Sequence, residues 1–469
     1  MSDTDFYGRT GELESLQDAY ERKTAEMAII YGHRRIGKTA LIQKFCEGKS
    51  VFFYTAKAWK DPYQLEQFSR AVGQFCENPQ QRFLDWAAAL KAVAARPLKT
   101  RKVLVIDEFQ YIAKERPSIL SELQVVWDEC LSHENILLIL CGSAVSFIAK
   151  EVLGEKNPLF GRARTIMEVR PLPFQTVAKF VPTYAVDDVF RGYAVLGGIP
   201  YFWQGLDPQR SMTENLAVNI LRSNGFLNDE AQSVLRQEFR DPATYNAILQ
   251  TIAFGTTAHS EIAQKSLVDV RTLSKYLSVL EDMGFIVKEF PVFSGSGEFG
   301  NASRGIYRIA DPYLKFWFRF LANNPTLSMT RQEALFEWTS AVEPYFAEFA
   351  SDAFERVCHQ YLIRLHFSGK LPFRPSTLGR WWKNAEEIDL VGADRERRHC
   401  LAAECKYRNQ KIDVKVLRSL QAKCRQLPVA DDCIFHYWIF SRAGFDDVLL
   451  EVASKDPMIH LVGMKQLID

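Results

Sequence analysis

The residues best suited to chemistry in the first third of the chain lie in one short loop, "GHRRIGKTA". Gly32 and Gly37 frame the loop, and Lys38 and Thr39 follow the second glycine. Glycines let backbone N–H groups turn toward phosphate oxygens, the lysine reaches the β- and γ-phosphates, and the threonine hydroxyl ligates Mg²⁺. An apolar run before the loop and a helical pattern after it supply the strand and helix that such a loop requires. We therefore expect ATP and Mg²⁺ to bind here, through Gly32, Arg35, Gly37, Lys38, Thr39 and Ala40.

Two acidic residues follow the next buried strand, in "KVLVIDEFQYI". A parallel strand brings such carboxylates to the carboxyl edge of its sheet, where ligands bind in open α/β folds. We expect Asp107 to hold Mg²⁺ through water and Glu108 to orient and deprotonate the attacking water. The alternative is a strand that simply ends at a polar loop. Ser143, after the strand "NILLILC", is placed to sense the γ-phosphate.

Arg162 lies in a Gly-Arg turn before a further strand, in "PLFGRARTIMEV". We expect this arginine to contact the γ-phosphate, either in its own subunit or from a neighbouring one. The alternative is a surface arginine that caps a turn. Arg34 and Arg35, inside the loop itself, are predicted to be structural or phosphate-adjacent rather than catalytic.

A second group of reactive residues lies near the end of the chain, in "EEIDLVGADRERRHCLAAECKYRNQ" (386–410). The stretch predicts two apolar strands joined by a charged turn, or merely a solvated hairpin that carries charges. Residues two apart on a strand share a side, so Glu404 and Lys406 face together, and the neighbouring strand brings Asp389 beside them. The two carboxylates would bind Mg²⁺, and Lys406 would position water or stabilise charge on a phosphate. Glu355, on a helix predicted over 343–362, could complete the set.

The surroundings of this second group are basic. Between Arg395 and Arg425 the chain has ten Lys and Arg against three acids, although its formal net charge is only +1. Phosphate backbones attract such a patch, and the "RWWKN" stretch (380–384) adds rings that would wedge against or stack on bases. In the alternative, the basic stretch is a solvated helix face and the tryptophans belong to a core.

Composition places the chain among globular proteins. Its 469 residues predict about three domains, and 47% apolar with 25% charged residues excludes a disordered chain. The first residues lack the pattern of a signal peptide, and the longest apolar runs are far shorter than the ~20 residues that span a bilayer. Nine cysteines without a C-x-x-C spacing argue against a disulfide framework or a zinc site. We expect a cytoplasmic protein with no membrane partner.

The segment between the two groups has a pattern of its own. Residues 245–293 read as three helices and a strand, with Asp269 placed to cap the last helix. The Gly- and Ser-rich stretch 294–305 suits a wing loop, so this segment predicts a winged helix. Arg271 and Lys275 would face a DNA groove. In the alternative, the unit packs against the nucleotide-binding domain and transmits its state.

Residues 1–240 resemble the archaeal-type ATPases of the STAND branch of AAA+-like P-loop proteins. The resemblance implies that the segment around Phe6 to Arg9 lines the adenine side, and that Gly197-Gly198-x-Pro200 lies in a helical lid. In that family the nucleotide usually works as a slow switch that controls assembly. The matching stretches are "FYGRTGELESL", "YGHRRIGKTALI", "VLVIDEFQYI", "LCGSAVSF", "LFGRARTIMEVRPLPF" and "AVLGGIPYFW".

The C-terminal set resembles the active site of PD-(D/E)xK nucleases, a fold that commonly accompanies archaeal-type ATPases. Some members of that fold lose the metal ligands. Here all four positions are filled, by Glu355, Asp389, Glu404 and Lys406. The resemblance implies that Asp389 and Glu404 bind the metal and that all four residues serve catalysis.

Together these patterns predict a multidomain α/β protein. Its expected parts are a P-loop ATPase with a parallel sheet (1–172), a helical lid (173–240), a winged helix-turn-helix (241–328) and an α/β restriction-endonuclease-like domain (329–469). We expect an ATP-hydrolysing switch protein that controls metal-dependent cleavage of DNA, directed at foreign or mobile DNA, and that forms homo-oligomers or nucleotide-dependent assemblies. Two alternatives stay open: a nucleotide-switched DNA-binding regulator, and a scaffold whose nuclease-like domain is inactive.

Overall fold

The computed structural model describes the whole chain except residues 1–5, 155–156, 240, 294–304, 323–327 and 384–385. The chain divides into two compact units. The front unit comprises residues 8–171 and 199–201, and the rear unit comprises residues 1–7, 172–198 and 202–469. In the described part of the chain, no helix combines the length and the apolar character that a bilayer span needs.

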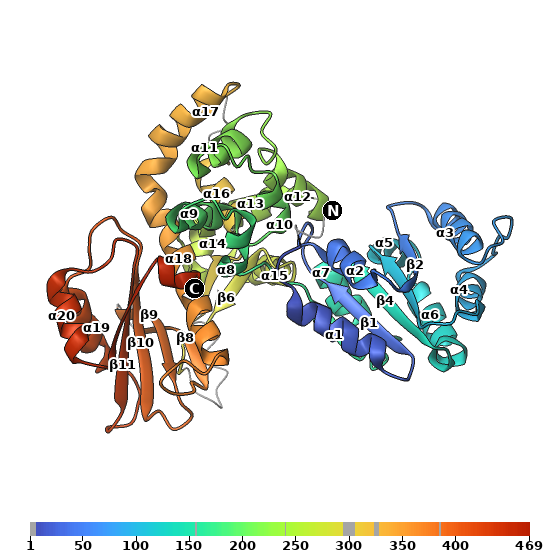
Figure 1. Ribbon diagram of the computed structural model, residues 1–469. Coiled ribbons are helices and arrows are strands. Elements are labelled where there is room, and N and C mark those ends of the chain that lie inside the picture. Colours follow the sequence, from blue (N-terminus) through green and yellow to red (C-terminus); the bar gives the residue numbers. More distant parts are fainter. Residues whose placement is uncertain (1–5, 155–156, 240, 294–304, 323–327, 384–385) are drawn as a thin grey trace. The chain divides into compact units, whose positions relative to one another are not determined.

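The front unit alternates strands and helices, shown from blue to teal in Figure 1. Its elements are α1 (Thr10–Glu21), β1 (Glu26–Tyr31), α2 (Lys38–Cys46), β2 (Ser50–Thr55), α3 (Asp61–Phe75), α4 (Trp86–Ala95), β3 (Lys102–Asp107), α5 (Gln110–Glu115), α6 (Ile119–Glu129), β4 (Ile136–Gly142), α7 (Val145–Phe147) and β5 (Thr165–Glu168).

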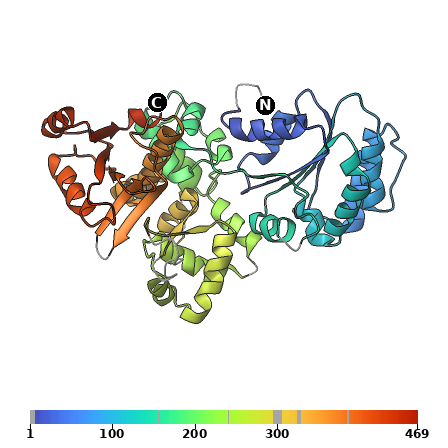
Figure 2. The ribbon, with the colours of Figure 1, turned by 90° about the horizontal axis from the view of Figure 1, so that it is seen from below.

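Five parallel strands form the sheet of the front unit, in the order β2-β3-β4-β1-β5. Strands β3 and β4 are buried along their whole length, and β4 is a continuous apolar run, as strands covered by helices on both faces require. Figure 2 shows helices on both sides of this sheet. Because all strands are parallel, the carboxyl ends of β1, β3 and β4 meet at one edge. The predicted phosphate loop and the predicted acidic residues follow these ends.

The rear unit contains the remaining helices and two further sheets. Its helices up to residue 320 are α8 (Phe174–Val177), α9 (Val186–Leu196), α11 (Met212–Leu216), α12 (Glu230–Glu238), α13 (Pro242–Ala253), α14 (His259–Ser266), α15 (Val270–Asp282) and α16 (Pro312–Phe320), and α10 (Pro200–Gln204) begins in the front unit and ends in the rear one. Short 3₁₀ or π turns lie at Leu131–His133 and Ile148–Val152 in the front unit and at Ala178–Phe180, Ala217–Leu221, Trp338–Val342 and Lys465–Leu467 in the rear unit.

The three helices and the strand predicted over 245–293 are present. Helices α13, α14 and α15 are followed by β6 (Ile286–Glu289), which pairs antiparallel with β7 (Ile306–Ile309). Asp269 caps α15 as predicted, because its carboxylate accepts a 2.8 Å hydrogen bond from the backbone N–H of Arg271. Arg271 and Lys275 are exposed on this helix. The predicted wing, 294–305, lies outside the described residues except for Gly305.

The C-terminal part of the rear unit is a mixed sheet between helices. Its elements are α17 (Arg331–Glu337), α18 (Glu343–Phe367), β8 (Thr377–Lys383), β9 (Glu386–Ala393), β10 (His399–Lys406), α19 (Val414–Cys424), β11 (Ile434–Ser441), α20 (Asp447–Lys455) and β12 (Ile459–Gly463). The strand order is β12-β11-β10-β9-β8; β9 is antiparallel to both neighbours, and β10, β11 and β12 are parallel. Figure 1 shows α18 on one side of this sheet and α19 and α20 on the other.

One sequence interpretation in this region is wrong. The "RWWK" residues do not precede the first strand as a free aromatic segment, because they lie within β8, which pairs with β9. Trp381 is 4% exposed and packs in a core cluster with Ile388 and Leu420. Alternation along a strand buries one tryptophan and leaves its neighbour, Trp382, half-buried. Trp381 therefore serves the core rather than base stacking.

Helix α9 packs beside the C-terminal sheet within the rear unit. Phe190 packs on Tyr407 and on Phe354 of α18, with ring centroids 4.6 Å and 5.5 Å away. Asp187, one turn earlier, forms two hydrogen bonds to Arg442, which follows β11. An aromatic contact and a paired charge thus fix α9 beside the end of β10.

Candidate functional site

The loop between β1 and α2 has the backbone conformation that phosphate binding needs. Gly32 and Gly37 have φ angles of 151° and 93°, which L side chains rarely adopt. A Cβ atom on Gly32 would also come within 2.4 Å of the Val169 carbonyl oxygen. Arg35, with φ of 63°, lies over the ring of Tyr201 at 4.5 Å from its centroid. The glycines are therefore required by geometry, and Arg35 shapes the loop by packing.

Lys38 points back into this loop. Its ammonium group donates hydrogen bonds to the carbonyl oxygens of Gly32 (2.8 Å) and His33 (2.9 Å). Burial lowers the pKa of Lys38, although the nearby carboxylates of Glu108 and Asp107 act in the opposite direction. A poorly hydrated ammonium gains most from charged acceptors, so phosphate oxygens are stronger partners for Lys38 than the two carbonyls. The predicted Ala40 lies beside it in the first turn of α2.

The two predicted Mg²⁺ ligands are in contact. The Thr39 hydroxyl donates a 2.8 Å hydrogen bond to Oδ2 of Asp107, although the two residues are 68 positions apart. The contact arises because β1 and β3 flank β4 and end at the same edge. Magnesium prefers oxygen ligands and keeps several waters, and a hydroxyl beside a carboxylate fits this preference.

Glu108 and Ser143 are also brought together. The Ser143 hydroxyl donates a 2.7 Å hydrogen bond to Oε2 of Glu108, and the side-chain amide of Gln110 donates to both residues, at 3.1 Å to Ser143. The carboxylate is thus held by two donors at the carboxyl edge of the sheet. Sequence reasoning missed Gln110. The residue is the buried first position of α5, and its only signal in the sequence was its place two residues after Glu108.

Arg162 does not lie at this edge. It precedes β5, whose Thr165 pairs in parallel with Ala28 early in β1, so Arg162 stands at the amino edge of the sheet. There it forms two hydrogen bonds, of 2.9 and 2.6 Å, to the carboxylate of Asp128 at the end of α6. Arg162 is therefore not brought to the phosphate loop of its own chain.

Arg9 is a second residue whose role the sequence did not reveal. Only 8% exposed and with φ of 66°, it donates hydrogen bonds to the backbone oxygens of Arg170 (2.7 Å) and Ile36 (3.0 Å). Ile36 lies inside the phosphate loop. The N-terminal segment thus braces this loop from outside through a buried guanidinium.

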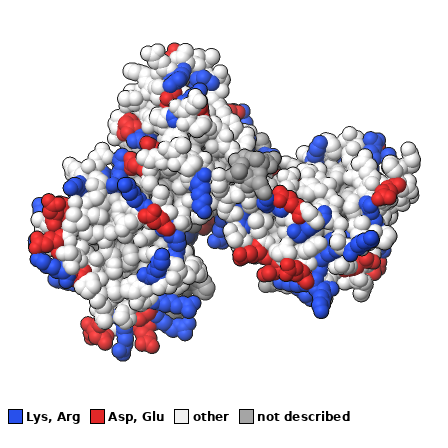
Figure 3. Space-filling view, viewed as in Figure 1, with Lys and Arg blue, Asp and Glu red and all other residues white. Residues whose placement is uncertain are grey.

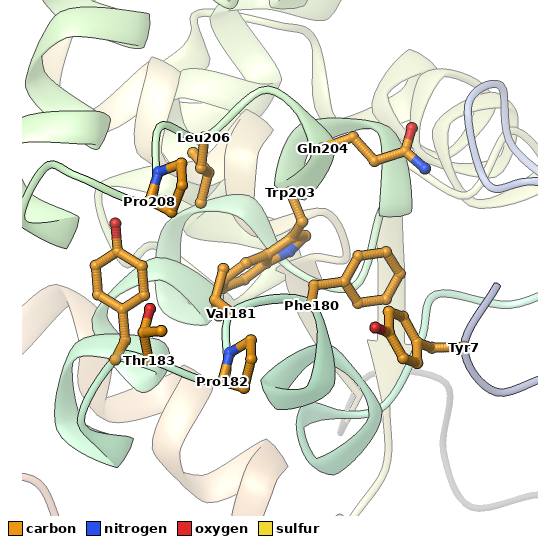
Figure 4. Close-up of a pocket in the computed structure, with 10 residues that line it drawn as sticks. Tyr7, Phe180, Val181, Pro182, Thr183, Trp203, Gln204, Leu206 and Pro208 are labelled. Carbon is orange, nitrogen blue, oxygen red and sulfur yellow. The ribbon is translucent and has the colours of Figure 1, made fainter. Parts of the chain in front are cut away.

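The rear unit has a pocket of about 590 Å³ near its N-terminal residues. Tyr7 and Phe180 line one end with rings in an edge-to-face contact, 5.0 Å between centroids, and Trp203 forms part of the wall (Figure 4). The lining is mostly apolar and includes Val181, Pro182, Leu206 and Pro208. Tyr7 belongs to the segment expected to line the adenine side.

Three of the predicted C-terminal residues form one cluster. Leu390 of β9 pairs with Ala403 of β10, so Asp389 and Glu404 follow side by side at the end of the ladder. They are 6% and 3% exposed. Lys406 contacts the Glu404 carboxylate and lies 3.6 Å from Oδ2 of Asp389.

Burial and neighbouring charges shift the pKa of two members of this cluster. Burial, reinforced by the charge of Glu404, raises the pKa of Asp389. Burial disfavours the charged form of Lys406, yet the carboxylates of Asp389 and Glu404 outweigh it and raise the pKa of Lys406. A cation placed beside Asp389 would favour the charged form of this carboxyl.

The fourth predicted residue is engaged elsewhere. Glu355 of α18 pairs with Arg380 of β8, which also lies 3.6 Å from Glu387. The fourth side chain of the cluster is instead Lys423 of α19, whose ammonium group donates a 2.6 Å hydrogen bond to Oε1 of Glu404. Nothing in the sequence pattern singled out Lys423. Among the residues that the structure describes, no three His, Cys, Asp or Glu side chains form a ready metal site.

The basic stretch after β9 is largely exposed. Its exposed members lie on the β9–β10 turn, on the segment after β10 and on α19: Arg395, Arg398, Arg408, Lys411, Lys415, Arg418 and Arg425. On the face shown in Figure 3, cationic and anionic side chains alternate over the molecule rather than forming one band. The predicted positive excess is therefore real but spread over several elements.

Comparisons with known proteins match both halves of the chain. A family model described as an ATPase domain predominantly from Archaea covers residues 6–202, and one described as "Archaea bacterial proteins of unknown function" covers residues 317–417. The protein MJECL04 of Methanocaldococcus jannaschii is 30% identical over 436 residues, 91% of this chain and 93% of MJECL04. The ATP-binding protein MJ0423 of the same organism is 46% identical over 46 residues, 10% of this chain and 78% of MJ0423.

Among solved structures, the Walker-type ATPase PABY2304 of Pyrococcus abyssi is similar at a TM-score of 0.53 with 19% identity, covering 68% of this chain and 97% of that one. At this identity the likeness shows the fold alone, and it agrees with the parallel sheet and phosphate loop described above. The second family model contains Asp389, Glu404 and Lys406 and assigns them no activity. Since MJECL04 matches nearly the full length of both chains, this protein belongs to the family of archaeal-type P-loop ATPases that carry this C-terminal domain.

Proposed function

We propose that the protein hydrolyses ATP in its front unit and that the nucleotide controls metal-dependent cleavage of DNA at the C-terminal cluster. The observation that carries the proposal is the contact of Asp389, Glu404 and Lys406 across strands β9 and β10. Charged groups are rarely buried unless a paired charge or a bound metal offsets the free energy of their desolvation. Two buried carboxylates beside a lysine suit a cation and a phosphate better than they suit a core.

The residues present fit the expected ions. In the C-terminal cluster, Asp389 and Glu404 would hold a divalent cation, and in the front unit Thr39 and Asp107 would hold Mg²⁺. A cation bound at the cluster supplies an activated water and neutralises charge on the phosphate. Lys406 contributes a positive charge, which the carboxylates of Asp389 and Glu404 favour. It therefore stabilises charge instead of removing a proton.

In the front unit, the protein's own groups divide the work of hydrolysis. Lys38 binds the β- and γ-phosphates, and Glu108 orients the attacking water. Ser143 donates to Glu108, so a γ-phosphate that attracts the Ser143 hydroxyl would also change the hydrogen bonding of Glu108. This link offers a way for the site to distinguish ATP from ADP.

Helix α9 supports nucleotide control of the C-terminal cluster. Its Phe190 packs on Tyr407, the residue directly after Lys406. The helix ends at Gly197, with φ of 61°, and the chain then enters residues 199–201, which belong to the front unit with the phosphate loop. Tyr201 in that segment lies against Arg35 of the loop. The segment 186–201 thus contacts Tyr407 in the rear unit and Arg35 in the front unit.

DNA is the proposed substrate because the cationic side chains of the stretch 395–425 are largely exposed and available to phosphates. Arg271 and Lys275 on α15 are a second exposed cationic pair, in the segment expected to be a winged helix. Assembly into oligomers is proposed from Arg162, which lies at the amino edge of its own sheet and would need a neighbouring nucleotide site. Foreign or mobile DNA remains the proposed target.

The test is a cleavage assay with matched variants. Supercoiled and linear DNA would be incubated with the protein, with Mg²⁺ or Mn²⁺, and with ADP, ATP or a non-hydrolysable analogue. We expect nicking that requires metal, disappears in Asp389→Asn, and depends on nucleotide in wild type but not in Lys38→Ala. Glu387→Gln, an exposed carboxylate on the same strand, is the control and should cut normally. DNA that stays intact under every condition would exclude the nuclease function.

A second candidate function is a nucleotide-switched DNA-binding regulator that does not cut. It is favoured by one observation: Glu355 and Glu404 already have cationic partners, in Arg380 and in two lysines. In the same experiment, this function predicts DNA that is retained by the protein, with an affinity that changes between ATP and ADP, and no metal-dependent nicking.

A further inference from the structure

Glu404 is held by two lysines, one on each carboxylate oxygen. Lys406, from its own strand, contacts Oε2, and Lys423, from α19, lies 2.6 Å from Oε1. The Glu404 side chain is 4% exposed, whereas those of Lys406 and Lys423 are 33% and 22% exposed. Both oxygens that could ligate a metal are therefore occupied by protein cations.

The cluster is electrically balanced as it stands. Asp389 and Glu404 contribute two negative charges, and Lys406 and Lys423 contribute two positive charges. A divalent cation added to this set would leave two uncompensated positive charges in a largely buried place, where charge interactions are strong. Such a site binds a metal weakly until anions arrive, and the phosphates of a nucleic acid are the anions that the proposed reaction provides.

The two lysines differ in how readily they can leave Glu404. Lys406 is two residues away on the same strand and also lies 3.6 Å from Asp389, so it stays near the carboxylates wherever the substrate is. Lys423 reaches the cluster from the last turn of a separate helix, where its ammonium group pairs with Oε1 of Glu404. Lys423 is thus the cation that a phosphate can draw away, which frees Oε1 of Glu404.

We propose that Lys423 is a positioning residue that makes metal binding depend on substrate. Without nucleic acid it occupies Oε1 of Glu404 and weakens metal binding. When a phosphodiester binds, the ammonium group turns to the phosphate and Glu404 becomes a metal ligand. The inference rests on the proposed function, since it concerns the same cluster, but it makes a claim about metal affinity that can be measured without cleavage.

The experiment measures Mn²⁺ binding to the full-length, nucleotide-free protein by calorimetry, with and without a short phosphorothioate duplex that resists cleavage. Binding lost in Asp389→Asn is assigned to the cluster. We expect weak Mn²⁺ binding alone and tighter binding with the duplex. Lys423→Met should bind Mn²⁺ tightly without DNA, by about tenfold or more over wild type, since a unit charge has been removed a few ångströms away.

Two further variants separate charge from structure. Lys423→Arg keeps the charge and should behave as wild type does. Lys455→Met removes a lysine that pairs with Glu451, four residues earlier on α20, and it should leave Mn²⁺ affinity unchanged. Thermal melting of each variant shows that the fold is kept. The isosteric change to methionine leaves Glu404 paired with Lys406, so the folded state should survive.

The results decide between distinct outcomes. Equal Mn²⁺ affinities of wild type and Lys423→Met without DNA would overturn the inference, as would a duplex that leaves wild-type affinity unchanged. If DNA is cut with metal and Asp389 while these affinities are equal, the inference fails and the proposed function stands. If Lys423→Met gains Mn²⁺ affinity but no protein cuts DNA, the inference stands and the nuclease function fails.

Discussion

Arg442 and Asp187 form a two-point ion pair inside the rear unit, with Nε 2.8 Å from Oδ1 and one Nη 2.7 Å from Oδ2. Such a fork fixes direction as well as distance. The guanidinium of Arg442 also lies over the ring of Tyr407, at 4.7 Å from its centroid. The pair therefore joins the first turn of α9 to Tyr407, the residue that follows Lys406.

Charge reversal at this pair should separate nucleotide control from cleavage. In Asp187→Arg, α9 would be repelled from Arg442, so we expect DNA cutting to lose its dependence on ATP while ATP hydrolysis continues. The double variant Asp187→Arg with Arg442→Asp should restore part of the dependence, with a coupling of about 0.5–3 kcal/mol. Cleavage rates with ATP and with ADP measure it.

The matched control for this prediction is Glu66→Arg, which reverses one charge of an exposed pair on α3. Exposed pairs of this kind contribute little, so this variant should keep its nucleotide dependence. An Asp187→Arg protein with full nucleotide dependence would show that α9 does not carry the signal.

Glu108→Gln should abolish ATP hydrolysis and keep ATP binding. The amide preserves the contact with Ser143 but can no longer accept a proton, so we expect turnover to fall by about 10²–10⁴-fold. Gln110→Ala should reduce turnover less, because Ser143 still holds the carboxylate. Phosphate release and binding of a fluorescent ATP analogue measure the two effects. The exposed Glu115→Gln is the control, and loss of nucleotide binding in Glu108→Gln would instead assign Glu108 a binding role.

The nucleotide-binding residues of the front unit could be predicted because they lie in short sequence motifs. A glycine-framed loop followed by Lys38 implies its own strand and helix, and parallel strands imply that Asp107 joins Thr39. The contacts of Gln110 and Lys423 were not predictable, because a side chain on a helix shows its partner only when packing sets the position of that helix. Both residues have ordinary helical neighbours in sequence.

In the C-terminal domain, too, contacts between distant elements could not be predicted from the sequence. Alternation along β10 correctly predicted that Glu404 and Lys406 share a side. The pairing of Glu355 with Arg380 could not be read from spacing, since it joins α18 to an edge strand. Trp381 was misinterpreted because an aromatic next to cations has the same local pattern in a binding surface and in a half-buried strand. Only the register with β9 distinguishes the two.

Asp352 should make the rear unit sensitive to acid. It contacts Arg308, Lys315 and Arg356, which join β7, α16 and α18. Burial opposes its charge, but Arg356, Lys315 and Arg308 together lower the pKa of Asp352 below its ordinary value of 3.8. A carboxyl whose pKa is lowered by folding stabilises the fold above its ordinary value, and this stability is lost as the pH falls through the folded pKa.

The variant Asp352→Asn tests this network. We expect the free energy of unfolding near pH 7 to fall by about 3–5 kcal/mol, because three cations lose their buried partner. The difference from wild type should shrink once the pH drops below 3.8, where the unfolded wild-type carboxyl is protonated. Denaturant titrations at both pH values measure it, with the exposed Asp447→Asn as control. A difference that stays constant with pH would assign the loss to packing rather than to charge.

Arg162 should act on the nucleotide of a neighbouring subunit. Its position at the amino edge of the sheet keeps it from its own phosphate loop, so we expect wild-type ATPase activity per molecule to rise with protein concentration. Arg162→Ala should lose this rise, with a loss of up to about 10³–10⁵-fold if the arginine contacts the γ-phosphate in the transition state.

Mixing two inactive variants supplies the decisive test. The Lys38→Ala protein cannot hold ATP but carries an intact Arg162, and it should restore activity to Arg162→Ala. The double variant Lys38→Ala, Arg162→Ala is the control that should restore nothing, and equal results with both partners would confine Arg162 to its ion pair with Asp128.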